Sequence, residues 1–167
     1  MYFKLPSFIK TTFITLVVFL ILPTHAFADE TEDIKKVVVA YNFGIVKMAK
    51  SSTVEHMVNI ISKKRANKLH LWIKSWHDNN LFMDTALPKM EFTNVNIGKG
   101  VAKVFVNEEW LYRYIDIKTK KITHPATRIL YAMKYELVKQ NHGWVVDDVK
   151  TLSEKQEKLI LGSKASD

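Results

Sequence analysis

A carboxylate and several aromatic side chains share one face of a predicted strand. From Val101 to Asp116 the residues alternate in character, as in a strand with one buried face. The mostly apolar set of alternate positions holds Ala102, Val104, Val106, Glu108, Trp110, Tyr112 and Tyr114. Because side chains two residues apart point to the same side of a strand, Glu108 is expected in apolar surroundings beside Trp110. Burial there would raise the pKa of its carboxyl group, which could then act as a general acid or base.

Two other roles are open to Glu108. A bulge before this residue would turn its side chain to solvent, because a shift of one residue reverses the faces of a strand. Glu108 could also form an ion pair with an arginine or a lysine, which is a structural rather than a catalytic use of a buried carboxylate.

The neighbouring predicted strand, 128–139, adds more aromatic residues. Its inner face carries Ile129, Tyr131, Met133, Tyr135 and Leu137. Together the two strands predict a cluster of aromatic side chains with polar tips: Trp110, Tyr112, Tyr114, Tyr131 and Tyr135. Such side chains suit a pocket that binds an apolar ligand and holds its polar end. Alternatively, they fill a core beneath the helices, since aromatic residues are common in strands.

The other candidate nucleophiles and metal ligands form no recognisable pattern. The sequence has no cysteine, no Gly-x-Ser-x-Gly motif and no phosphate-binding glycine loop. His70 and His77 lie seven residues apart, about 10 Å along a helix, so they cannot share a metal ion by themselves. We therefore expect neither a metal nor a cofactor.

Two helical regions precede the strands. Apolar residues recur at helical spacing from Thr31 to Lys50, which predicts an amphipathic helix. Ser52 and Glu55 form a capping-box pattern that begins a second helical region, either one bent helix or two short ones, ending at 77–80. Its basic residues are expected on a solvated helix face rather than on a membrane surface. They are Lys63, Lys64, Arg65, Lys68 and Lys74.

The second half of the chain has the pattern of strands joined by short turns. The expected strands are 91–97, 101–116, 128–139 and 144–151, with turns at 98–100 and 141–143 and a polar connection at 118–125. Ser153 and Gln156 predict the cap of a short final helix that ends at Gly162. The strand 101–116 is long enough to predict a bulge or a strong bend within it. The fold class is therefore α+β, with two or three N-terminal helices packed on a curved antiparallel meander.

The N-terminus has the composition of a cleavable export signal. Lys4 and Lys10 precede an apolar run of about a dozen residues, and Pro23 comes before Ala26-Phe27-Ala28, a small-x-small cleavage site. The run is shorter than the roughly 20 residues of a membrane-spanning helix, so an uncleaved anchor is the less favoured alternative. We expect a signal peptide at 1–28 and a single domain at 29–167, with no transmembrane segment after processing.

The predicted mature domain is basic. The chain carries a formal charge of +8, and loss of Lys4 and Lys10 leaves +6. This charge predicts either weak contact with anionic surfaces or simply solubility. Export makes nucleic acid an unexpected partner. It places the protein in the periplasm or the extracellular space, depending on the envelope of the host.

Three strand segments carry a resemblance to a known family. They are 101–108 (VAKVFVNE), 131–137 (YAMKYEL) and 143–148 (GWVVDD), the last with Gly-Trp at the start of the final strand. Following two helical regions, they resemble the nuclear-transport-factor-like superfamily, also called the SnoaL-like or cystatin-like cone. The resemblance covers nearly all of the chain after residue 28 and implies a cone-like domain. Enzymes of this fold commonly use an acidic residue or a histidine with a tyrosine, which implies Glu108 with Tyr112 or Tyr135 in this chain.

Three functions are consistent with these features. The first is an exported, non-enzymatic domain that binds a small apolar molecule or an envelope protein through its aromatic concave face. The second is a pocket enzyme of the isomerase or hydrolase kind, with Glu108 as base and Tyr112 or Tyr135 as donor. The third is a structural component of an envelope assembly. The lack of a catalytic pattern in the sequence favours the first.

Overall fold

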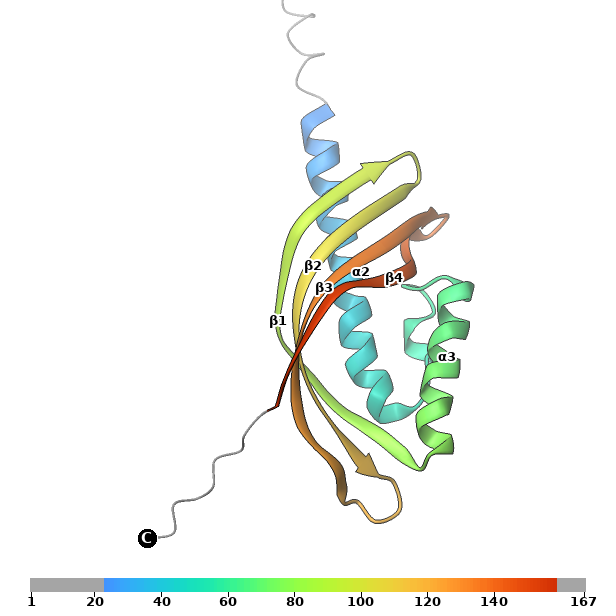
Figure 1. The fold of residues 1–167 in the computed structure, drawn as a ribbon. Helices are drawn as coiled ribbons and strands as arrows, with labels where there is room; N and C mark the ends of the chain where they lie inside the picture. The colour runs from blue at the N-terminus through green and yellow to red at the C-terminus, as the bar shows by residue number, and fades with distance from the viewer. Residues whose placement is uncertain (1–22, 159–167) are drawn as a thin grey trace, which may run out of the picture.

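Two helices, one helical turn and four long strands follow one another in residues 23–158, which the computed structural model describes (Figure 1). The elements are α2 (Pro23–Ser51), η1 (Glu55–Met57), α3 (Lys63–Asp78), β1 (Leu81–Gly98), β2 (Val101–Asp116), β3 (Ile122–Gln140) and β4 (Gly143–Lys158). The strands pair in the order β1-β2-β3-β4, each antiparallel to the next. The sheet curves around α2, and α3 lies on the same side. The expected α+β class, with helices packed on a curved antiparallel meander, is confirmed.

Helix α2 packs on the concave face through one stripe of side chains. Ile34, Val38, Tyr41, Ile45 and Met48 recur every three or four residues, and all are buried. On the strands they meet alternate residues such as Val104 and Val106 of β2, Leu137 of β3 and Val146 of β4. The core therefore lies between one helical stripe and the inner face of the sheet.

Ser52 ends α2 instead of capping the next helix. Its φ of 62° is left-handed, and its N–H donates to the Met48 carbonyl at 2.8 Å, as at many helix C-termini. An N-cap residue needs an extended backbone, so the predicted capping box of Ser52 with Glu55 is wrong. The Glu55 N–H instead donates to Thr53 Oγ1 at 3.3 Å.

The second helical region is two separate pieces, η1 and α3. Between them, the Ser62 N–H donates to the Val146 carbonyl and the Val146 N–H donates to the Ile60 carbonyl, each at 2.9 Å. These bonds occupy backbone groups that a continuous helix would need, and they cover part of the outer edge of β4. Ser62 then caps α3, because its Oγ accepts the Arg65 N–H at 3.1 Å.

Extra residues in β1, β3 and β4 curve the sheet. The pairing register shifts twice between β1 and β2, once at 86–89 around Pro88 and once at 92–94. It also shifts in β3 at 123–126, and in β4 at Asp147 and Leu152. Strand β2 itself has no extra residue, so the bulge expected there lies in its neighbours. The alternation of β2 is unbroken through Glu108, and bulges in the flanking strands supply the bend.

Three strands are longer than the sequence pattern predicts. Strand β1 begins at Leu81, ten residues before the expected start, and continues through Pro88 at a bulge of an edge strand, where proline is tolerated. Strand β3 begins at Ile122, inside the expected polar connection. The predicted final helix is wrong, because Ser153 pairs with Ala132 and Gln156 pairs with Ile129 as β4 continues along β3. Gly162 lies outside the described residues.

The predicted signal peptide overlaps the described residues only at 23–28, which form the first turns of α2. The cleavage site after Ala28 thus stays a prediction. No helix within residues 23–158 has both the length and the apolar character needed to cross a membrane.

Candidate functional site

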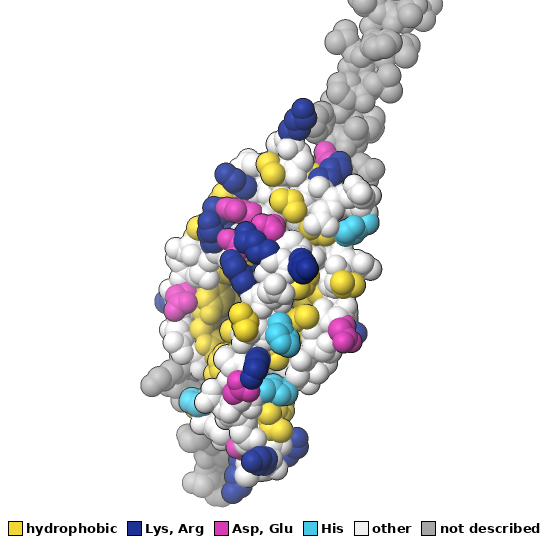
Figure 2. All heavy atoms as spheres, turned by 90° about the vertical axis from the view of Figure 1, so that its right-hand side faces the viewer, with side chains coloured by type: hydrophobic (Ala, Val, Ile, Leu, Met, Phe, Trp, Pro, Cys, Tyr) yellow, Lys and Arg dark blue, Asp and Glu magenta, His cyan; other side chains and the backbone are white. Residues whose placement is uncertain are grey.

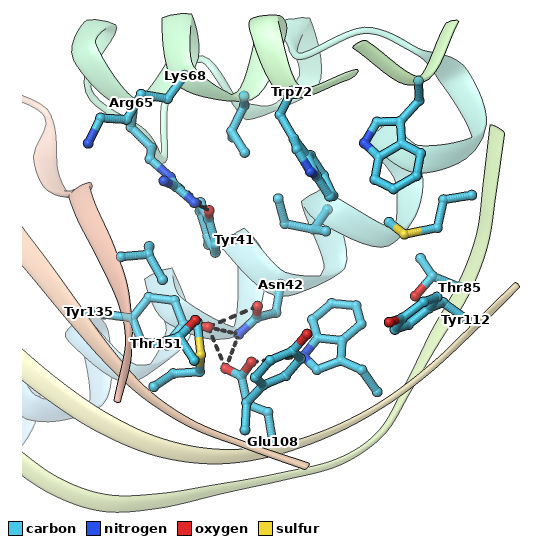
Figure 3. Close-up of a pocket in the computed structure, with 18 of the residues that line it drawn as sticks. Tyr41, Asn42, Arg65, Lys68, Trp72, Thr85, Glu108, Tyr112, Tyr135 and Thr151 are labelled. Atoms are coloured by element: carbon cyan, nitrogen blue, oxygen red, sulfur yellow. Dashed lines mark hydrogen bonds between the residues drawn. The ribbon is translucent and has the colours of Figure 1, made fainter. Parts of the chain in front are cut away.

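A cavity of about 510 Å³ lies between the two helices and the concave face of the sheet (Figure 3). Side chains from α2, α3 and all four strands line it. The lining includes Glu108 and all five aromatic residues that the sequence predicted: Trp110, Tyr112, Tyr114, Tyr131 and Tyr135. The structure therefore brings the predicted site residues together around one space, and that space lies within the 300–1,000 Å³ typical of ligand pockets.

Glu108 lies at the wall of the cavity and is held by three side chains. It is 4 % exposed, and its Oε1 accepts hydrogen bonds from Asn42 Nδ2 at 2.9 Å and from the Tyr135 hydroxyl. Its Oε2 accepts the indole N–H of Trp110 at 2.8 Å. The second Nδ2 hydrogen of Asn42 reaches the Tyr135 oxygen at 2.9 Å, so the group forms a closed network between α2, β2 and β3 (Figure 3).

This environment acts on the pKa of Glu108 in two opposing ways. Burial raises the pKa above its ordinary value, whereas the hydrogen bonds from Trp110, Tyr135 and Asn42 lower it, and burial prevails. No lysine, arginine or histidine of residues 23–158 forms an ion pair with this carboxylate. Oε1 has two donors and Oε2 only one, so Oε2 keeps one position for a proton or for a donor on a bound molecule.

The tyrosines of the cavity are hydrogen-bonding groups rather than phenolates at neutral pH. Burial raises the pKa of Tyr114 and of Tyr131 to about 12, and it raises that of Tyr112 as well. Burial and the neighbouring Glu108 raise the pKa of Tyr135 well above its ordinary value. Of the two tyrosines predicted as partners of Glu108, Tyr135 bonds to it and Tyr112 does not.

One end of the cavity is an aromatic wall. The rings of Trp76 and Tyr114 stack with centroids 4.4 Å apart, and Trp72 meets Trp76 edge to face at 6.0 Å. The indole nitrogen of Trp76 is buried and has no hydrogen-bond partner within residues 23–158. A buried N–H without an acceptor is unusual in a folded protein.

The other end of the cavity carries basic groups from α3. The guanidinium of Arg65 donates from Nε to the Tyr41 hydroxyl at 2.8 Å and from Nη2 to the same oxygen, and it lies 5.4 Å from the ring centre. Burial raises the pKa of Tyr41, which Arg65 partly opposes. Lys68 also lines the cavity and is bonded to Asp148 at 2.8 Å.

Most of the basic segment of α3 is on the solvated face, as expected. Lys64 pairs with Asp147 at 2.9 Å, and Lys74 pairs with Asp78 at 2.6 Å. Figure 2 shows this side of the molecule, where hydrophobic side chains lie in a recess beside a group of intermixed basic and acidic side chains. Such exposed ion pairs contribute little to stability.

Sequence reasoning missed Asn42, Tyr41 and Arg65 as site residues. A signal for Asn42 was available: it lies four residues after Val38 and three before Ile45, inside the buried stripe of α2, where a polar residue needs a partner. Nothing in the local sequence distinguishes Arg65 from the lysines around it.

The arrangement defines a small α+β domain with a partly aromatic cavity between its helices and its sheet. Its sequence matches no protein-family model and no curated protein. Among solved structures, its fold is similar to the intermembrane space region of the chloroplast protein ARC6. The TM-score is 0.52 at 14 % sequence identity, over 65 % of this chain and 78 % of that chain. At this identity the similarity concerns the fold alone, and the resemblance to the nuclear-transport-factor-like superfamily stays a prediction.

Proposed function

We propose that this protein is an exported, non-enzymatic binding domain whose cavity takes a small, mostly apolar molecule. The observation that supports this most is the cavity of about 510 Å³ lined by an aromatic wall and a few polar groups. Trp110 and Tyr135 are buried in the core, but the space beside them is larger than the few water-sized voids of an ordinary protein interior, which supports the proposal. The export signal would deliver the domain to the periplasm or the extracellular space.

The lining has the composition that binding an apolar molecule requires. The rings of Trp72, Trp76 and Tyr114 offer a wide apolar surface, and Trp72 is 36 % exposed. The polar groups are few and fixed in place by the network around Glu108. Apolar surface gives the affinity in such a site, and a few oriented polar groups give the specificity.

Native mass spectrometry of the purified full chain tests this proposal, together with titration by an apolar probe. Three of the four tryptophans line the cavity, so tryptophan fluorescence reports directly on its occupancy. We expect a co-purifying small molecule, or a saturable change in emission with decan-1-ol.

Two variants of β4 decide whether the cavity is the site. Val149→Trp puts a large side chain into the cavity and should weaken binding by at least tenfold. Leu152→Trp is the matched control, because Leu152 is 54 % exposed on the same strand and does not line the cavity. Equal binding by the wild type and Val149→Trp would show that the ligand does not occupy this cavity. A wild type that binds nothing would refute the proposal.

The second candidate function is a pocket enzyme that uses Glu108 as acid or base. The observation that favours it is the buried carboxyl group at the cavity wall, with a raised pKa and one open position on Oε2. Tyr135, which bonds to Glu108, is then the donor rather than Tyr112. Incubation of a bound molecule with the protein in D₂O tests it. Deuterium uptake at carbon, or cleavage, that Glu108→Gln abolishes would favour the enzyme, whereas unchanged ligand favours the binding domain.

A further inference from the structure

The charges at the start of α3 are not balanced. Lys64 and Lys68 each form an ion pair with a carboxylate of β4, namely Asp147 at 2.9 Å and Asp148 at 2.8 Å. Arg65 lies between these lysines in the sequence but forms no ion pair with any carboxylate of residues 23–158. The nearby acidic groups of β4 are thus already paired with lysines, and no carboxylate offsets the positive charge of the Arg65 guanidinium.

Arg65 is held in place and directed to the cavity. Its Nε and Nη2 both donate to the neutral Tyr41 hydroxyl, which fixes the side chain without neutralising it. Its Nη1 has no acceptor within the described part of the chain, and the residue is half-buried and lines the cavity. A guanidinium with donors left over, held rigidly beside apolar surface, is well suited to bind a carboxylate or a phosphate.

The charged side chains of α3 and the aromatic wall lie at different ends of the cavity. Trp76 lies eleven residues after Arg65 on α3, about 16 Å further along the helix axis. Figure 3 shows Arg65 and Lys68 on one side of the space, Thr85 and Tyr112 on the other, and Trp72 between them. The charged residues of the lining are Arg65, Lys68 and Glu108, so none belongs to the aromatic wall.

At the end of the cavity formed by the start of α3, a ligand therefore faces a positive charge. Lys68 is offset by Asp148, which leaves the charge of Arg65. Glu108 is the competing feature, because a buried carboxylate beside aromatic rings could also attract a cation. However, three of its hydrogen-bonding positions are already taken by Asn42, Tyr135 and Trp110.

We infer that the ligand of this cavity is an amphipathic anion, with its carboxylate or phosphate head on Arg65 and its apolar chain along the Trp72–Trp76 wall. The inference rests on the proposed function, since it specifies what the cavity binds. It assigns Arg65 as the residue that selects for the charge of the head group.

A series of probes with one chain and four head groups tests this inference on the full chain. Decanoate, decyl phosphate, decan-1-ol and decyltrimethylammonium are titrated below their micelle concentrations, with tryptophan emission as the readout. One charge-assisted contact changes affinity by about tenfold or more, so decanoate or decyl phosphate should bind at least tenfold more tightly than decan-1-ol. The tighter of the two anions shows whether the head is a carboxylate or a phosphate.

Arg65→Gln should remove the preference for anions, so that decanoate and decyl phosphate no longer bind more tightly than decan-1-ol. Lys64→Gln is the control, because it removes one charge from the same turn of α3 at an exposed position. If Arg65→Gln does not fold, Arg65→Lys is used in its place. This variant keeps the charge and should retain part of the preference for anions. Equal binding of all four probes, or tightest binding of the ammonium, would overturn the inference while the proposed function stood. Binding of none would overturn both.

Discussion

Glu108→Gln tests the physical account of the buried network most directly. Glutamine has the shape of glutamate, and its carbonyl oxygen can accept the hydrogen bonds from Asn42 and Tyr135. Its amide group then faces the indole N–H of Trp110, which already donates to this position at 2.8 Å. Because two donors meet there, we expect the variant to be less stable than the wild type by about 1–3 kcal/mol at pH 4, the cost of a buried donor without an acceptor.

The difference between the two proteins should shrink as pH rises. Burial raises the pKa of Glu108 in the folded state, so the folded protein holds this proton more tightly than the unfolded chain does. The resulting stability is fully present below the unfolded pKa of about 4.3, and it is lost as pH rises through the folded pKa. Each unit by which folding raises the pKa removes about 1.4 kcal/mol from the wild type and nothing from Glu108→Gln.

Urea unfolding of both proteins between pH 4 and pH 9 measures this difference. Surface carboxylates whose pKa is lowered, such as Asp148 and Asp116, change stability in the opposite direction, but they cancel when the proteins are compared at the same pH. Glu91→Gln, at an exposed position of β1, controls for the loss of one negative charge. A gap that widens with rising pH would mean that the three hydrogen bonds outweigh burial, and it would refute the reasoning.

Two further variants test the packing around the site. Tyr135→Phe removes a donor to Glu108, so we expect a loss of about 1–3 kcal/mol in urea unfolding, larger at pH 8 than at pH 4 because the bond favours the ionised carboxylate; equal losses at both pH values would contradict this. Gly44→Ala places a Cβ 2.8 Å from the Met57 side chain, and overpacking of about 1–3 kcal/mol should exceed the helix-propensity gain of at most about 1 kcal/mol. Thermal unfolding measures the overpacking in Gly44→Ala, and adding Met57→Ala should partly relieve it. A Gly44→Ala variant more stable than the wild type would contradict this reasoning.

The inner face of β2 could be predicted because its periodicity is local. Strand β2 runs from Val101 to Asp116, as the alternation indicates, and Glu108 is buried because the extra residues of the sheet lie in the neighbouring strands. A period of two needs only the residues themselves, and no bulge interrupts it before Glu108.

What could not be predicted depends on contacts distant in the sequence. Ser153 and Gln156 have the spacing of a helix cap, but pairing with β3 gives their backbone a strand partner, and tertiary context overrides a weak local preference. The break between η1 and α3 has the same cause, since residues 60–62 bond to Val146 of β4. Asn42 meets Glu108 across 66 residues of sequence, which no local pattern reports.

The buried network argues that stability alone does not explain this interior. Asn42, Glu108 and Tyr135 are each nearly inaccessible to solvent, and taking their polar groups out of water costs free energy that their mutual hydrogen bonds only partly return. Well-packed apolar side chains of similar volume are often as stabilising as a buried polar cluster, or more so. The proposed function offers a reason for this network, because fixed polar groups at the cavity wall could orient a bound molecule. Loss of probe binding in variants of the network that remain folded is the outcome that this argument requires.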